Sequence, residues 1–148
     1  MTPPETTALV RQSWAAIVPV RKQVCADFYR HLFAGYPELR PLFKGDMERQ
    51  TALFVTMMNT VVSALENPDP VIPLIKTVGA RHAGYGVLEA DYDKFADVLL
   101  ETFAQALGED FTPEVRAAWT EVYAHLAGTM KQGAAEDGDR RPRRMRSG

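Results

Sequence analysis

The residue in this chain best placed to do chemistry is a histidine on an apolar helical face. Counted along a helix, Val71, Ile75, Val78 and His82 are spaced four, three and four residues apart, so their side chains share one stripe. An imidazole in such a stripe is either a hydrogen-bonded core residue or a metal ligand. These four residues alone leave both alternatives open.

The sequence predicts a sharp turn directly after this histidine. Gly84 and Gly86 flank Tyr85, and closely spaced glycines at this position are typical of a helix end and a chain reversal. We expect the turn to bring Val87 back beside His82.

A second polar residue stands within an apolar helical pattern. Gln50 occupies the first position of its stripe, one turn before Phe54. Its amide either faces the same space as the phenyl ring or is solvated at the start of the helix. Periodicity does not decide between these two interpretations.

Segments with helical periodicity must position these side chains. Their approximate limits are 6–18, 20–34, 37–43, 50–65, 70–82, 91–107 and 113–132. No segment alternates apolar and polar residues with period two, and none carries a hairpin signal. The sequence therefore predicts an all-α protein of about six to seven helices, without an internal repeat at a fixed period.

Length and composition indicate one soluble domain. The chain has 148 residues, of which 46% are hydrophobic, and its apolar runs are too short to span a bilayer. The N-terminal MTPPETT lacks a basic and apolar leader, so we expect a cytoplasmic protein. Cys25 is the single cysteine, which fits a reducing compartment and is typical of a packing residue.

Charge is divided unevenly along the chain. Residues 1–139 carry 12 basic and 19 acidic side chains, a balance of −7, whereas residues 140–148 hold five arginines and no acid. The acidic body has no basic face interleaved with aromatic residues, so we expect no nucleic-acid partner. We predict a domain over residues 1–132 and a disordered, Arg-rich tail over residues 133–148.

Motifs for several other chemistries are missing from the sequence. There is no phosphate-binding G-x-x-x-x-G-K, no H-E-x-x-H and no C-x-x-C. What remains is one inward histidine on a late helix, one inward amide on the helix before it, and aromatic residues between them. Haem suits this set, because its iron takes an axial imidazole and its porphyrin needs an apolar crevice with a polar rim.

Several segments together carry a family resemblance. They are FYRHLF, YPELRPLF, Gln50-x-x-x-Phe54, GARHAGYGV, DY…LL and FTPEVRAAWTEVY, at nearly fixed spacing between about residues 5 and 132. The chain resembles a bacterial single-domain globin, most of all the Hell's Gate type, and is similar to the globin domain of flavohaemoglobins.

The resemblance implies a globin fold, a three-over-three helical sandwich around haem b, and it assigns roles by position. His82 would be the proximal iron ligand, and Phe43 would wedge against the porphyrin. Tyr29 and Gln50 would face the bound gas on the distal side, with Phe54 above the iron.

Further residues are expected around the cofactor: Val78, Tyr85, Val87, Tyr92 and Phe95. Helix geometry predicts that the N–H of the second ring nitrogen of His82 donates a hydrogen bond to a backbone carbonyl near Val78.

Tyr92 matches a tyrosine that lies near the proximal imidazole in flavohaemoglobins. That family pairs this tyrosine with a glutamate on the last helix, at a position that is Ala134 here, although Glu136 is close in sequence.

The leading functional hypothesis is a haem globin that binds O₂ and releases it slowly. Bound O₂ acquires superoxide character, so the donors Tyr29 and Gln50 would stabilise it. NO and CO are further expected ligands.

Three other functions stay open. One is nitric oxide dioxygenation with an external reductase, because 148 residues leave no room for a flavin or nicotinamide domain. The others are a gas or redox sensor and a haem-free interaction module.

Overall fold

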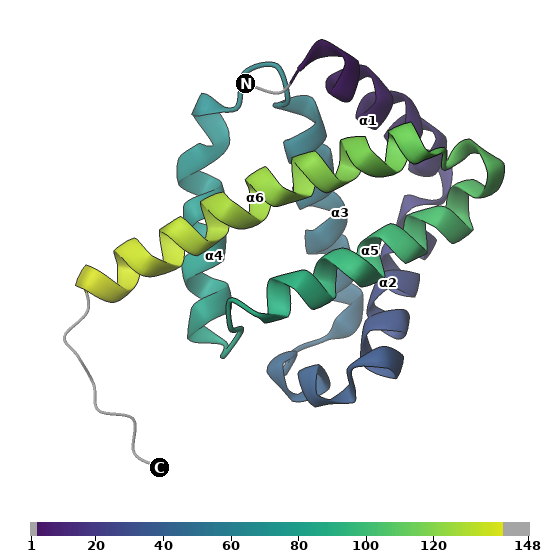
Figure 1. Cartoon of the computed structure of the whole chain (residues 1–148). Helices are drawn as coiled ribbons and strands as arrows, with labels where there is room; N and C mark the ends of the chain where they lie inside the picture. The colour runs from purple at the N-terminus through teal and green to yellow at the C-terminus, as the bar shows by residue number, and fades with distance from the viewer. Residues whose placement is uncertain (1–2, 141–148) are drawn as a thin grey trace.

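The structure, a computed structural model, describes residues 3–140 and is built from helices joined by short turns (Figure 1). The six α-helices are α1 (Pro4–Ile17), α2 (Arg21–Gly35), α3 (Met47–Ser63), α4 (Ile72–Gly84), α5 (Asp91–Leu107) and α6 (Pro113–Arg140). Four short 3₁₀ helices connect them: η1 (Val18–Val20), η2 (Pro37–Leu42), η3 (Asp69–Val71) and η4 (Gly108–Asp110). No strand occurs within residues 3–140, so the all-α prediction is confirmed.

The helices form two layers of three. Helices α1, α3 and α4 make one layer, and α2, α5 and α6 make the other, with contacts across the layers between α4 and α6, α1 and α6, and α2 and α3. Figure 1 shows α6 lying across α4. This is the three-over-three arrangement that the sequence predicted.

Aromatic residues fill the centre of the sandwich. The rings of Trp119 and Phe103 lie 4.7 Å apart, and Trp14 lies 6.4 Å from each of them. Trp119 donates its indole N–H to the Ser13 hydroxyl over 2.8 Å, which satisfies the indole N–H inside the core. This core fixes α1, α5 and α6 with respect to one another.

The backbones of α4 and α6 approach closely because two glycines face the contact. A Cβ atom on Gly79 would collide with the Met130 carbonyl, and one on Gly133 would collide with the backbone of Lys76. The absence of side chains at these positions lets the helices touch backbone to backbone. Helix α4, which carries His82, is therefore held firmly against α6.

Helix α6 extends beyond Gln132, where the sequence predicted its end. Its last turns remain helical because Gly133 packs on α4 and because Glu136 pairs with Lys76 over 3.1 Å. Residues 133–140 are thus helical in the structure, whereas the sequence predicted a disordered tail from residue 133. The rest of the predicted Arg-rich tail, residues 141–148, lies outside the described residues.

Candidate functional site

The end of α4 holds His82 in a defined orientation. Its Nδ1 lies 2.7 Å from the Val78 carbonyl oxygen, one helical turn back. Gly86 has a φ of +101°, a left-handed conformation that suits glycine and reverses the chain. The Val87 amide then donates to the His82 carbonyl over 3.0 Å, and the Val87 side chain is buried. The expected bond to Val78 and the expected return of Val87 are both confirmed.

The bond to Val78 determines the tautomer of His82. A carbonyl oxygen only accepts hydrogen bonds, so Nδ1 carries the proton and Nε2 of the neutral ring keeps its lone pair. Burial lowers the pKa of His82 and outweighs the opposing effect of the Val78 bond. Within residues 3–138, nothing forms a hydrogen bond with Nε2. A neutral imidazole with a free Nε2 is suited to bind a metal.

Five aromatic rings from α2, α3 and the segment after η2 form one cluster around Tyr29. The centroid of the Tyr29 ring lies 5.2 Å from Phe28, 6.1 Å from Phe33, 5.5 Å from Phe43 and 5.7 Å from Phe54. Most of these pairs meet edge to face, which is a favourable arrangement for aromatic quadrupoles.

Gln50 lies beside this cluster and is not simply solvated. Its Nε2 donates a hydrogen bond to the Tyr29 hydroxyl over 3.1 Å. Asp46 caps the start of α3 by accepting from the Glu48 amide over 2.9 Å, and this cap sets where Gln50 falls on the helix. The structure thus brings together Tyr29, Gln50 and Phe54, the three residues that the sequence predicted to lie near one another, and adds Phe43 to them.

The Tyr29 hydroxyl stays protonated over the physiological range. Burial raises its pKa to about 12, although the hydrogen bond from Gln50 acts in the opposite direction. The phenol is therefore a lasting hydrogen-bond donor beside the aromatic rings.

Helices α3 and α4 make little contact with each other, although they belong to the same layer. Several large apolar side chains are only half-buried: Phe43, Phe54, Val78 and Phe95. Large apolar side chains are normally covered in a folded domain. Half-buried apolar side chains and an imidazole suited to bind a metal fit a flat, apolar, metal-bearing cofactor.

Tyr92, near the start of α5, is buried and stacks edge-on to Phe95 with ring centroids 5.9 Å apart. The Tyr123 hydroxyl donates to the Tyr92 carbonyl over 2.7 Å and so ties α6 to α5. Lys131 places its ammonium 5.4 Å from the centroid of the Tyr92 ring. Burial raises the pKa of the Tyr92 phenol, which therefore stays neutral.

The carboxylate that flavohaemoglobins offer to this tyrosine has no equivalent in the contacts of Tyr92. Its position is held by Ala134, and the nearby Glu136 is engaged with Lys76 over 3.1 Å. A cation, Lys131, lies over the tyrosine ring instead.

Some predicted residues stay apart from these clusters. The Tyr85 side chain is 63% exposed, so the structure does not bring it to the aromatic cluster. His31 bonds to the Thr102 hydroxyl over 3.0 Å, and His125 is exposed, so both fit the role of ordinary polar residues. Burial raises the pKa of the Cys25 thiol to about 12, as expected for a packing residue.

Sequence reasoning missed three residues that contribute to the site. Phe28 and Phe33 pack on Tyr29, and the place of Phe33, four residues after Tyr29 on the same helix, was a usable signal, whereas that of Phe28, one residue before it, was not. Lys131 gave no such signal, because it meets Tyr92 only through the packing of α6 on α5.

Two further kinds of site are missing from the described residues. No group of three or more histidine, cysteine, aspartate or glutamate side chains within them could hold a metal ion. None of their helices has the length and apolar content needed to cross a membrane.

A three-over-three helical sandwich that presents one imidazole and a tyrosine–glutamine pair has the architecture of a globin. The family model described as Globin matches residues 26–130, and the chain belongs to this family. Among curated relatives, the flavohemoprotein of Bacillus subtilis is 28% identical over 117 residues, which are 74% of this chain and 29% of that protein. The chain thus spans under a third of the length of the flavohemoproteins that it matches.

Two solved structures share the fold of this chain. An engineered carbene transferase from Rhodothermus marinus, described as a candidate nitric oxide dioxygenase, is 28% identical and superposes with a TM-score of 0.86 over 94% of this chain and 97% of that chain. A bacterial globin from Campylobacter jejuni, 19% identical, shares the fold with a TM-score of 0.82 over 93% of this chain and 99% of that chain.

Proposed function

We propose that this chain holds haem b and binds oxygen reversibly, with slow release because Tyr29 and Gln50 donate hydrogen bonds to the ligand. The observation that carries the proposal is the bond of 2.7 Å between His82 Nδ1 and the Val78 carbonyl. It fixes the plane of the imidazole and leaves Nε2 free to bind the iron of a haem group. Membership of the globin family and the half-buried apolar side chains support the same cofactor.

Apolar residues from several elements would hold the ring. They are Phe43 after η2, Phe54 on α3, Val78 on α4, Val87 after α4 and Phe95 on α5. The exclusion of water by these side chains protects the cofactor. Tyr85 and Tyr92 remain predicted contacts.

When bound, haem supplies a ferrous iron that binds oxygen reversibly and places negative charge on it. The Tyr29 hydroxyl can stabilise such a ligand because it accepts from Gln50 and keeps its own proton to donate. Hydrogen bonds to charged groups contribute about 1.5–3 kcal/mol, which corresponds to a release slowed roughly tenfold to somewhat over a hundredfold. CO and NO would enter the same space.

A second candidate function is the removal of nitric oxide, which the similarity to flavohemoproteins and to the candidate nitric oxide dioxygenase favours. The reaction joins NO, O₂ and one electron into nitrate, so each turnover needs a reductant. The electron would come from a reductase outside these 148 residues.

A cytoplasmic location also remains a prediction.

Absorption spectroscopy tests the haem proposal directly. The purified chain should show a Soret band, and the pyridine haemochrome should identify haem b. His82→Ala should lose the axial ligand and change the ferrous spectrum, whereas His125→Ala, at an exposed histidine, should keep it. A colourless chain that refuses added haemin, or an unchanged five-coordinate ferrous signature in His82→Ala, would overturn the proposal.

Stopped-flow mixing separates the two functions. The oxygenated protein is mixed with nitric oxide, and turnover is followed under an added reductant. Sustained consumption of nitric oxide would favour detoxification, and a single turnover followed by arrest would favour simple oxygen binding.

A further inference from the structure

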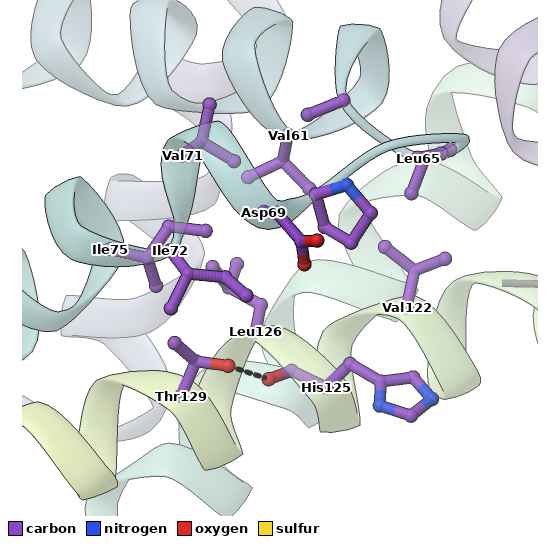
Figure 2. Close-up of a pocket in the computed structure, with 12 residues that line it drawn as sticks. Val61, Leu65, Asp69, Val71, Ile72, Ile75, Val122, His125, Leu126 and Thr129 are labelled. Carbon is purple, nitrogen blue, oxygen red and sulfur yellow. Dashed lines mark hydrogen bonds between the residues drawn. The ribbon is translucent and has the colours of Figure 1, made fainter. Parts of the chain in front are cut away.

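A pocket lies away from His82 and from the Tyr29 cluster, where the end of α3, η3, the start of α4 and the middle of α6 meet (Figure 2). Its cavity volume is about 290 Å³. It shares no lining residue with the Tyr29 cluster and does not include His82. The proposed haem chemistry therefore leaves this pocket without a role.

The walls of the pocket are aliphatic. The apolar side chains that line it come from α3, the connection to α4, α4 and α6: Val61, Ala64, Leu65, Pro68, Val71, Ile72, Ile75, Val122 and Leu126. Such a surface favours the aliphatic or alicyclic body of a small molecule.

Three polar residues complete the lining: Asp69, His125 and Thr129. The Thr129 hydroxyl is already engaged, because it donates to the His125 carbonyl over 3.0 Å. Figure 2 shows the carboxylate of Asp69 beside the apolar side chains, and because Asp69 is exposed, this carboxylate lies on the solvent side of the pocket. Within residues 3–138, the Asp69 side chain takes part in no hydrogen bond or ion pair.

We propose that this pocket binds a small organic cation, an amine with an aliphatic body of about six to eight carbons. The size follows from the volume, because a cavity of ~150 Å³ already holds a benzene-sized molecule. The charge follows from Asp69, an exposed carboxylate that forms no hydrogen bond or ion pair with the side chains of residues 3–138. Residues 1–139 also carry a balance of −7, which disfavours an anion at the same surface.

The experiment uses the full chain as purified, under carbon monoxide, so that no iron position is open to an amine. Hexylamine is titrated at neutral pH while the methyl resonances of Ile72, Ile75 and Val122 are followed by NMR. These methyl groups should shift in a saturable manner. Hexanol should bind more weakly, and hexanoate should not bind.

Two variants and a control assign the site. Asp69→Asn should weaken hexylamine binding about two- to fivefold, the range for a partly exposed ion pair, and leave hexanol binding unchanged. Ala64→Leu should fill the pocket and weaken both ligands. Asp97→Asn, which removes an exposed carboxylate on α5, should change neither.

Three results would overturn the proposal. The first is the absence of methyl shifts at millimolar hexylamine, and the second is hexanoate binding as tight as that of hexylamine. The third is an Asp69→Asn variant that binds hexylamine with unchanged affinity. For Asp69→Asn, hexylamine and hexanol are compared within the variant, so a loss of folding is recognised by the loss of both. For Ala64→Leu, the urea midpoint shows whether the weaker binding comes from a filled pocket or from a loss of folding.

Discussion

The Gln50 amide donates a hydrogen bond of 3.1 Å to the Tyr29 hydroxyl and so links the start of α3 to the middle of α2. The phenol oxygen accepts this bond, and no acceptor for the phenol proton is present among residues 3–138. Tyr29 is therefore oriented by one neighbour and has its proton left for a ligand. This division of roles underlies the first two predictions.

Replacement of Tyr29 by phenylalanine should raise the oxygen dissociation rate about tenfold or more, because a hydrogen bond to a charged ligand is lost. The rate is measured by stopped-flow displacement of oxygen by CO. Tyr36→Phe removes a hydroxyl from a tyrosine outside the cluster and should leave the rate unchanged. An unchanged rate in Tyr29→Phe would remove this residue from the mechanism.

Gln50→Leu should also raise the dissociation rate, and its effect should depend on Tyr29. Because the Gln50 amide orients the Tyr29 phenol, Gln50→Leu should raise the oxygen dissociation rate only slightly in a protein that already carries Tyr29→Phe. The four proteins of this double-mutant cycle are compared by dissociation rate. Strictly additive effects would show that the two side chains act independently.

Phe54→Ala should speed ligand association several-fold, because the ring packs 4.9 Å from Phe28 and 5.7 Å from Tyr29 and fills the space beside the phenol. Flash photolysis of the CO complex gives the association rate. Phe54→Leu, which keeps more apolar volume, should show a smaller change in the same direction. Leu53→Ala, at the exposed neighbouring position, should have no effect.

Gly79→Ala should destabilise the protein by about 1–3 kcal/mol or more, since the new methyl group would collide with the Met130 carbonyl, a backbone atom that cannot move aside. Gly128→Ala, on α6 with no atom near its Cβ position, should be neutral or stabilising by about 0.4–1 kcal/mol. Urea unfolding measures both. Equal midpoints for the two variants would contradict the close contact of α4 and α6.

Alkaline pH should weaken the fold through Cys25 and Tyr29. Burial raises the pKa of each group to about 12, above the values of 9.0 for the thiol and 10.0 for the phenol in an exposed chain. The unfolded chain therefore releases protons first, so stability is complete below about pH 9 and falls as the pH rises towards 12. Urea midpoints at neutral pH and at about pH 11 measure this loss.

Variants at both positions separate the two contributions. Cys25→Ala should remove the loss of stability that begins near pH 9.0, where an exposed thiol titrates. Tyr29→Phe should remove the loss that begins near pH 10.0, where an exposed phenol titrates. A midpoint that does not change with alkaline pH would show that neither group is held neutral by burial.

Local sequence patterns predicted the parts of the site that lie on one element. His82 and Val78 are four residues apart on a helix, so their bond of 2.7 Å followed from helix geometry. The return of Val87 likewise followed from the glycines after the helix. By contrast, periodicity could not show whether Gln50 was solvated or bonded, because its partner Tyr29 is 21 residues away on another helix.

The sequence alone determined the helical class, the placement of His82 on an apolar stripe and the aromatic character of α2. These features arise from contacts between residues a turn or two apart. The tertiary structure decided that Gln50 orients Tyr29, that Lys131 lies over Tyr92, and that α6 continues to Arg140. Each of these depends on how separate helices meet: α3 on α2 for the first, α6 on α5 for the second, and α6 on α4, through Gly79 and Gly133, for the third.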